Sequence, residues 1–106
     1  MNDAFLQTLG LCRRAGRAVF GFDTVKQAIF NREAQLVFTA ADLSAKTESR
    51  LSYICRETGI ELIQTAYDIR TLGGSIGKAT GIIAVTDAGF ATLLKQKFCN
   101  YREGTL

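Results

Sequence analysis

Ile82-Ile83-Ala84-Val85-Thr86 is the most apolar strand pattern of the chain, and its four consecutive apolar residues leave no side that could face water. Strands of this kind are buried on both faces, unlike the alternating strands of a sheet that has one solvated face. Residues 36–39, with the sequence LVFT, have the same character. The two runs therefore predict a central sheet with helices packed against both of its faces.

Helices are predicted between the strands, because apolar residues recur three or four positions apart behind a capping side chain. Glycines at positions 16, 59 and 77 are suited to end three of these helices. The polar tail, residues 100–106, is expected to fray. The expected helices span residues 2–15, 24–31, 44–59, 68–77 and 88–98, and the expected strands span residues 17–20, 36–39, 60–64 and 82–86.

Carboxylates are scattered along the chain at positions that precede predicted helices. An oxygen at such a position accepts a hydrogen bond from a free backbone N–H group, and capping accounts for Asp23, Asp42, Asp68 and Asp87. No pair of them stands out as an acid/base couple for catalysis. The expected capping residues are Asn2 or Asp3, Asp23, Asp42, Ser44, Asp68 and Asp87.

The length of 106 residues suits one domain, because a second domain would leave each half with too small a core. No linker, internal repeat or proline divides the chain. Hydrophobic residues make up 47% and charged residues 22%, which is enough apolar content for a folded core. We therefore predict an α/β fold over residues 1–106: a three-layer α/β/α sandwich with a small mixed central sheet.

Several catalytic and metal-binding classes are excluded by composition. The chain has no His, which removes Ser-His and Cys-His catalysis and His-based zinc sites. Cys12, Cys55 and Cys99 are too far apart for a CxxC pair, and their odd number argues against a disulfide framework. We expect buried thiols in a reducing cytosol. The sequence favours a protein that is not an enzyme and carries no metal or cofactor.

No apolar run approaches the roughly 18 residues that a membrane-spanning helix needs. The first 18 residues include Asp3, Arg13 and Arg14 and do not resemble a signal peptide. We expect a cytoplasmic protein without a membrane partner.

The glycine-rich segment 72–78, with the sequence LGGSIGK, invites comparison with a phosphate-binding loop. That loop needs a glycine five positions before the Gly-Lys pair and a hydroxyl after the lysine, and here those positions hold Leu72 and Ala79. The favoured alternative is that Gly73 and Gly77 allow a short helix to approach its neighbours closely, with Lys78 at its C-terminal end.

A second candidate anion site begins at Gly21, where a predicted strand ends and a helix opens. Free N–H groups, a glycine and Lys26 in the first turns suit a phosphate-binding cradle, although an ordinary glycine turn explains the same residues. The formal charge of +3 lies entirely in residues 1–32, which hold five basic and two acidic side chains. Arg13, Arg14 and Arg17 also fit a simple solvated helix end.

Four segments in order resemble the kink-turn-binding ribosomal protein family. They are residues 21–29 (GFDTVKQAI), 34–42 (AQLVFTAAD), 72–78 (LGGSIGK) and 82–87 (IIAVTD). The opening at residues 12–16 (CRRAG) is similar to the small bacterial YlxQ-like branch, and the resemblance covers residues 9–94. It implies an α/β/α sandwich that binds a sharply bent RNA, without catalysis and without a DNA partner, and we expect a monomer.

The resemblance also implies where RNA would lie, namely against the glycine-led helix start and the loop before the last strand. The classical members carry Asn, Glu and Lys where this chain has Asp23, Thr24 and Gln27. Phe22 either covers a base or is buried as a helix staple. The predicted RNA-binding residues are Gly21, Phe22, Asp23, Thr24 and Gln27 at the first surface and Lys78, Ala79, Thr80 and Gly81 at the second, with Lys26, Arg32 and Lys78 neutralising phosphates.

The changed charges at this surface leave a second hypothesis open, a protein-interaction module on the same fold with weak or lost RNA specificity. An enzyme that acts on a small molecule or a nucleotide is the third, and the broken phosphate-loop pattern argues against it.

Overall fold

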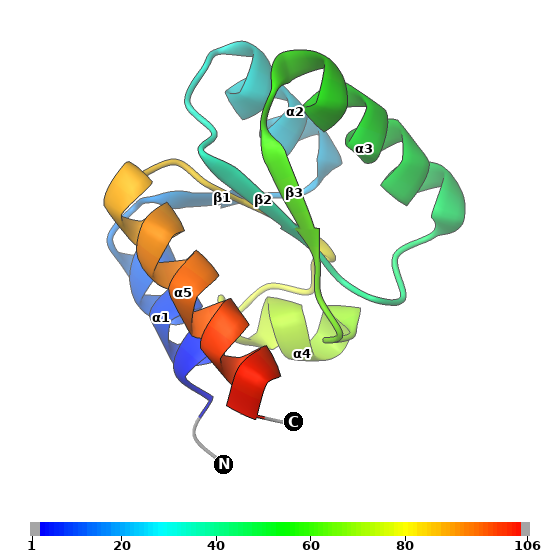
Figure 1. Cartoon of the computed structure of the whole chain (residues 1–106). Coiled ribbons are helices and arrows are strands. Elements are labelled where there is room, and N and C mark those ends of the chain that lie inside the picture. The colour runs from blue at the N-terminus through cyan, green and yellow to red at the C-terminus, as the bar shows by residue number, and fades with distance from the viewer. Residues whose placement is uncertain (1–2, 105–106) are drawn as a thin grey trace.

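Four strands form one mixed sheet in the order β1-β4-β2-β3 (Figure 1). The computed structural model describes the backbone of residues 3–104 and the side chains of residues 3–98. The inner strand β4 runs antiparallel to both of its neighbours, β1 and β2, whereas β2 and β3 are parallel. The strands span Ala18–Phe20 (β1), Leu36–Thr39 (β2), Glu61–Gln64 (β3) and Ile82–Val85 (β4).

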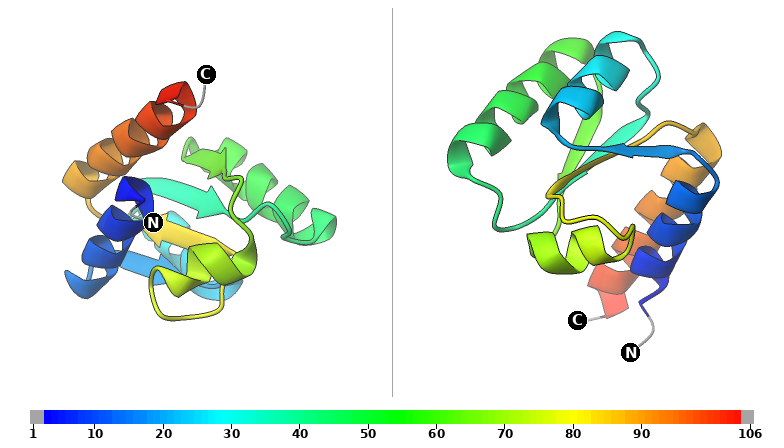
Figure 2. Two further views of the ribbon diagram at one scale, coloured as in Figure 1. Left: turned by 90° about the horizontal axis from the view of Figure 1, so that it is seen from below. Right: turned by 180° about the vertical axis from the view of Figure 1, so that it is seen from behind.

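The helices cover both faces of this sheet (Figure 2, left). One face packs against α1 and α5 and the other against α2 and α3, while α4 closes one end (Figure 1). The three layers and the mixed sheet confirm the predicted fold class. The helices span Ala4–Arg14 (α1), Phe22–Phe30 (α2), Ala45–Thr58 (α3), Ile69–Gly74 (α4) and Ala88–Gly104 (α5).

The two inner strands carry the core, because every residue of β2 and β4 is buried. Phe38 and Ile83 point into the cluster beneath α1 and α5, and Val37 and Ala84 point into the cluster beneath α2 and α3. Successive side chains of a strand point to opposite faces, so a wholly apolar strand needs a helix layer on each side. The pattern that predicted the sandwich is therefore the pattern that builds its core.

Two of the expected helix caps are wrong. Asp23 lies in the first turn of α2, whose N-cap is Gly21, because the Gly21 carbonyl already accepts the Val25 N–H group at 3.0 Å. Asp42 caps α4 rather than α3, since its Oδ1 accepts the Ile69 N–H group at 2.8 Å. Asp3, Ser44, Asp68 and Asp87 accept N–H groups at the starts of α1, α3, α4 and α5, as expected.

Two helix ends also differ from the prediction. The helix α4 ends at Gly74 rather than near Gly77, because the N–H groups of residues 75–77 bond to carbonyls three residues back and tighten the chain into turns. The backbone of α5 continues to Gly104, so the predicted end at residue 98 and the predicted fraying from residue 100 are wrong over residues 100–104. In the part of the chain that the structure describes, no helix combines the length and apolar character needed to cross a membrane.

Cys12 and Cys55 are buried, as predicted, and Cys99 lies outside the residues whose side chains are described. Burial, with a smaller contribution from the charge of Asp87, raises the pKa of Cys12 from 9.0 to about 11. Burial and then the charge of Glu48 raise the pKa of Cys55 to about 11. Neither thiol suits nucleophilic chemistry near neutral pH, because the thiolate is the reactive form.

The buried thiols lead to a first prediction. At pH 8, iodoacetamide should alkylate Cys12 and Cys55 about a hundred-fold more slowly in the folded protein than in urea, because a pKa two units higher leaves that much less thiolate. Peptide mass spectrometry reads each cysteine separately. Equal rates in the folded and unfolded protein would contradict the burial of these side chains.

Candidate functional site

The two surfaces predicted from the sequence lie side by side. Gly21, at the end of β1, donates its N–H group to the carbonyl of Ile82 at 3.1 Å, and Phe20 pairs with Ile83 across the two strands. Because β1 and β4 are antiparallel, the start of α2 adjoins the loop that leads into β4 (Figure 2, right). Segments that are about sixty residues apart thus form one surface.

The start of α2 has no side-chain cap, whereas a side-chain oxygen caps the starts of α1, α3, α4 and α5. Gly21 has a φ of 91°, a conformation that other residues rarely adopt, and nothing lies within 4 Å of where a Cβ atom would be. The first N–H groups of a helix have no partner within it and carry the positive end of its dipole. This end of α2 can accept an anion such as a phosphate.

Two cations approach one aromatic ring beside this helix start. The Arg13 guanidinium carbon, on α1, lies 5.7 Å from the centre of the Phe20 ring, and Lys78 Nζ lies 5.8 Å from the same point. Both distances are within the range of cation–π attraction. Phe20 is half-buried against the core and precedes Gly21 directly, so it places both charges next to the start of α2.

A third cation lies over the next aromatic residue. The Arg50 guanidinium carbon, on α3, is 4.7 Å from the centre of the Phe22 ring. Phe22 is half-buried and packs against the core cluster beneath α2 and α3. The Phe22 ring therefore lies between that core and the Arg50 guanidinium.

Arg13, Lys78 and Arg50 contact aromatic rings, and none of them forms an ion pair with a carboxylate of a described side chain. Among the residues whose side chains are described, the one ion pair joins Lys95 to Glu61, at 2.8 Å on the exposed side of β3. Arg13, Arg50 and Lys78 are all exposed, so their charges face solvent beside the uncapped helix. Asp23 is exposed in the first turn of α2 and places one negative charge among them.

Some of the other candidate residues are exposed at this surface, and others support the loop before β4 from within the protein. Thr24, Gln27 and Ala79 are exposed, and Lys26 is half-buried one turn after Phe22 on the same face of α2. The Thr80 hydroxyl bonds to the backbone of Ile82, which fixes the loop. Gly81 is buried between Ile69 and Leu43, so it supports the loop from beneath.

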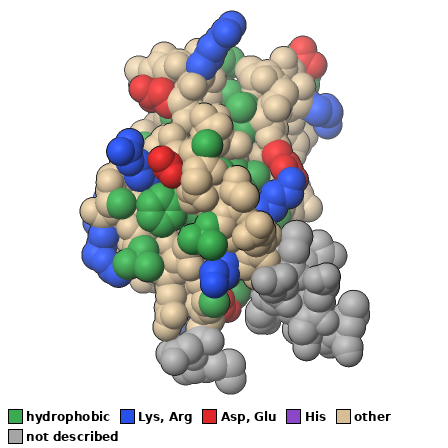
Figure 3. Space-filling model, turned by 60° about the vertical axis from the view of Figure 1, so that its left-hand side comes forward, with side chains coloured by type: hydrophobic (Ala, Val, Ile, Leu, Met, Phe, Trp, Pro, Cys, Tyr) green, Lys and Arg blue, Asp and Glu red, His purple; other side chains and the backbone are tan. Residues whose placement is uncertain are grey.

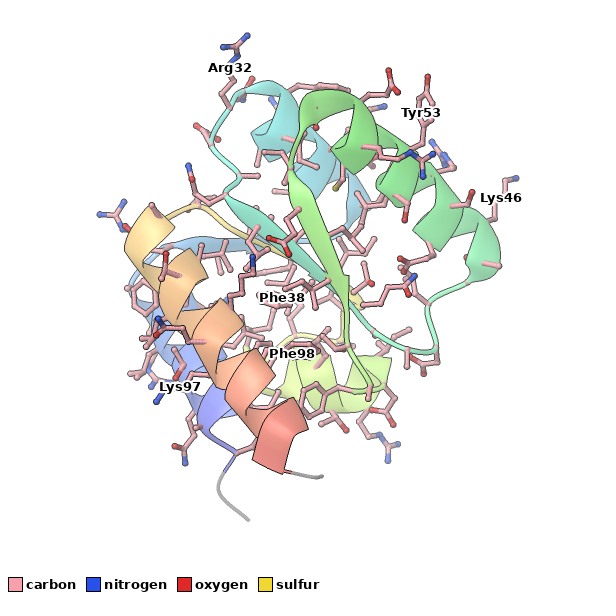
Figure 4. All side chains as sticks on the ribbon, in the orientation of Figure 1. Arg32, Phe38, Lys46, Tyr53, Lys97 and Phe98 are labelled. Carbon is pink, nitrogen blue, oxygen red and sulfur yellow. The ribbon has the colours of Figure 1, made fainter. Side chains whose placement is uncertain are left out.

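Arg32 is not brought to this surface. It follows the C-terminal end of α2, and Figure 4 shows it extending from the turn beyond that helix. A helix of nine residues is about 13 Å long, and the uncapped start is at its other end. The phosphate-neutralising role predicted for Arg32 would therefore need a contact well away from Gly21.

The segment 72–78 is built as a structural turn rather than as a phosphate loop. The N–H groups of residues 75–78 all donate to carbonyls of residues 72–74, so none of these four is available to cradle a phosphate. A Cβ atom on Gly73 would meet the Lys78 carbonyl oxygen and lie 2.7 Å from the Thr80 nitrogen. The close packing predicted at Gly73 is therefore present, and it holds the loop that carries Lys78. Gly77 makes no such close approach; it ends the turn with a φ of 75°.

The residues predicted for this surface do not include Arg50, and Arg13 also fits a simple solvated helix end. Arg13 belongs to the basic cluster of the first third of the chain, which is a weak signal for it. Arg50 carries no such signal, because its contact with Phe22 joins residues on two different helices.

Comparison with known proteins places these observations in a wider group. The model of the ribosomal protein L7Ae/L30e/S12e/Gadd45 family matches residues 3–95. The chain is 38% identical over 87 residues to the RNA-binding protein YlxQ of Bacillus subtilis, covering 81% of this chain and 86% of that protein.

Two solved structures show the same fold. A protein of unknown function from Bacillus halodurans superposes with a TM-score of 0.86 at 30% identity, covering 92% of this chain and 98% of that one. The 15.5kD RNA binding protein of Giardia lamblia superposes with a TM-score of 0.74 at 15% identity, covering 94% and 89% of the two chains.

Proposed function

Because this chain belongs to the ribosomal protein L7Ae/L30e/S12e/Gadd45 family, we propose that it is a non-enzymatic RNA-binding protein that recognises a kink-turn or a similarly bent element of a ribosomal or regulatory RNA. The observation that carries the proposal is that three cations, Arg13, Lys78 and Arg50, lie over Phe20 and Phe22, the two rings on either side of Gly21 at the uncapped start of α2. A relative that is named as RNA-binding supports it.

The arrangement suits RNA because proteins recognise folded RNA mainly by its shape and by its unstacked bases. The free N–H groups of α2, together with Arg13 and Lys78, bind backbone phosphates, which supply most of the affinity. Asp23 repels phosphate but accepts a hydrogen bond from a base amino group, so we assign it to a base edge. A rigid sheet end with two adjoining loops holds these groups in one geometry.

The function is tested by titrating a fluorescent kink-turn RNA and an unkinked duplex of the same composition. We expect tighter binding to the kink-turn, and a fall in affinity as salt is raised because bound phosphates release counterions. Equal and weak binding to both RNAs would exclude the proposal.

The substitution Lys26→Glu should weaken kink-turn binding by about ten-fold or more, because it reverses a charge close to the phosphate-binding helix start. The matched control is Arg32→Glu, which makes the same change of charge beyond the other end of α2. Both variants should melt like the unmodified protein, since Arg32 is exposed and Lys26 is only half-buried. If the two variants lose affinity equally, net charge rather than the site governs binding.

A protein-binding role on the same fold has one observation in its favour. Leu11 on α1 and Leu93 on α5 are 52% and 39% exposed. Figure 3 shows apolar side chains gathered on the side where α1 and α5 lie, with basic side chains around them. Copurification of a protein partner that survives nuclease treatment, combined with no kink-turn preference, would favour this role.

A further inference from the structure

We infer that Arg50 contacts RNA directly, by presenting its guanidinium plane as a stacking surface for one unpaired base. This rests on the proposed function and deepens it, because it adds a residue of α3 to a surface otherwise made by α1, α2 and the loop before β4. It also assigns to Arg50 the contact with a base that the sequence offers as one of two roles for Phe22.

The geometry of the pair carries the inference. The Phe22 ring packs on the core beneath α2 and α3, and the Arg50 guanidinium carbon lies 4.7 Å from the ring centre. A guanidinium is planar, weakly hydrated and stacks on aromatic faces, so a supporting ring limits its freedom. Arg50 is exposed, and it is the outer member of the pair. A base approaching Phe22 therefore meets Arg50 first.

The surroundings of Arg50 also suit RNA. No carboxylate of a described side chain forms an ion pair with it, so its charge remains available. Lys46 and Tyr53 lie four residues before it and three after it, which places all three on one face of α3. Both are exposed and extend outward from α3 in Figure 4. Basic side chains combined with an exposed aromatic ring are typical of surfaces that bind unpaired nucleotides. This face of α3 carries Lys46, Arg50 and the exposed ring of Tyr53.

The chemistry of stacking makes the inference testable apart from simple charge attraction. Unpaired bases in RNA stack on aromatic rings and on Arg guanidinium planes. A lysine keeps the positive charge but has no plane, so Arg50→Lys removes the stacking surface and leaves the charge. Arg56→Lys is the matched control, because Arg56 is also an exposed arginine of α3 and has no ring contact among the described residues.

The experiment measures the affinity of the unmodified protein and both variants for a kink-turn RNA, and for the same RNA with each unpaired nucleotide made abasic in turn. Arg50→Lys should weaken binding to the intact RNA about ten-fold, and Arg56→Lys should not. At one abasic position the unmodified protein should lose a similar factor, and Arg50→Lys should then cause no further loss. Thermal melting verifies that all three proteins are folded.

Two results would overturn the inference while the proposed function stands. Either Arg50→Lys binds the intact RNA as well as the unmodified protein does, or its loss is the same on the intact RNA and on every abasic RNA. If the unmodified protein shows no preference for the kink-turn over a duplex, the proposed function fails and this inference fails with it.

Discussion

The Ile83→Asp variant is expected to be unfolded at 25 °C. Ile83 is fully buried in β4, an inner strand with a neighbour on each side and a helix layer on each face. The change removes a core side chain and leaves a carboxylate without water or a partner, which together cost roughly 5 kcal/mol or more. That is comparable to the whole stability of a small domain. Circular dichroism and urea unfolding would measure the loss.

Ile83→Val is the matched control for this prediction. It keeps an apolar, β-branched side chain in the strand and deletes one methyl group, so we expect a loss of about 1 kcal/mol and a native fold. A cooperatively folded Ile83→Asp protein with near-native stability would contradict the burial of β4 and the three-layer fold with it.

Gly73→Ala should destabilise the protein by roughly 3 kcal/mol and weaken kink-turn binding as well. A Cβ atom at this position would run into the Lys78 carbonyl oxygen and lie 2.7 Å from the Thr80 nitrogen. Both are backbone atoms, which cannot move aside as a flexible side chain can. The loop must shift, and Lys78 would move away from Phe20.

The adjacent glycine offers a matched control on the same short helix. A Cβ atom on Gly74 would meet nothing within 4 Å, so Gly74→Ala should leave the loop and RNA affinity unchanged and should alter stability by less than about 1 kcal/mol. Denaturant unfolding and RNA titration compare the two variants directly. Similar losses in both would show that the contact between Gly73 and the loop does not position Lys78.

Much of the fold could be predicted because its signals are local. The apolar runs in β2 and β4 required two covered faces, and the structure buries every residue of both strands. Ser44 and Asp68 each cap the helix that follows by accepting the N–H group of a residue only three positions ahead in the chain. Asp42 was assigned to the wrong helix for the opposite reason, since its partner, Ile69, is 27 residues away.

The candidate site was predictable in part. Residues 21–27 and residues 78–81 each form one unbroken segment of the sequence. The structure places the two segments next to each other through the pairing of β1 with β4. Arg32 is close to Gly21 along the chain, but α2 carries it to the other end. Whether a basic residue contributes to this surface therefore depends on its place in the fold more than on its distance along the chain.

The sequence alone was enough to predict the α/β/α sandwich, the positions of most helices and strands, and the glycine-led start of α2, because backbone conformation and burial follow from neighbouring residues. Which cations lie over which rings depends instead on how the helices and strands pack. Arg13 and Lys78 both lie over the Phe20 ring, and Arg50 lies over the Phe22 ring. Lys78 is 58 residues from Phe20 along the chain, and Arg50 is 28 residues from Phe22. A contact between a cation and a ring has no sequence period, so packing of the sheet and helices must bring its two partners together.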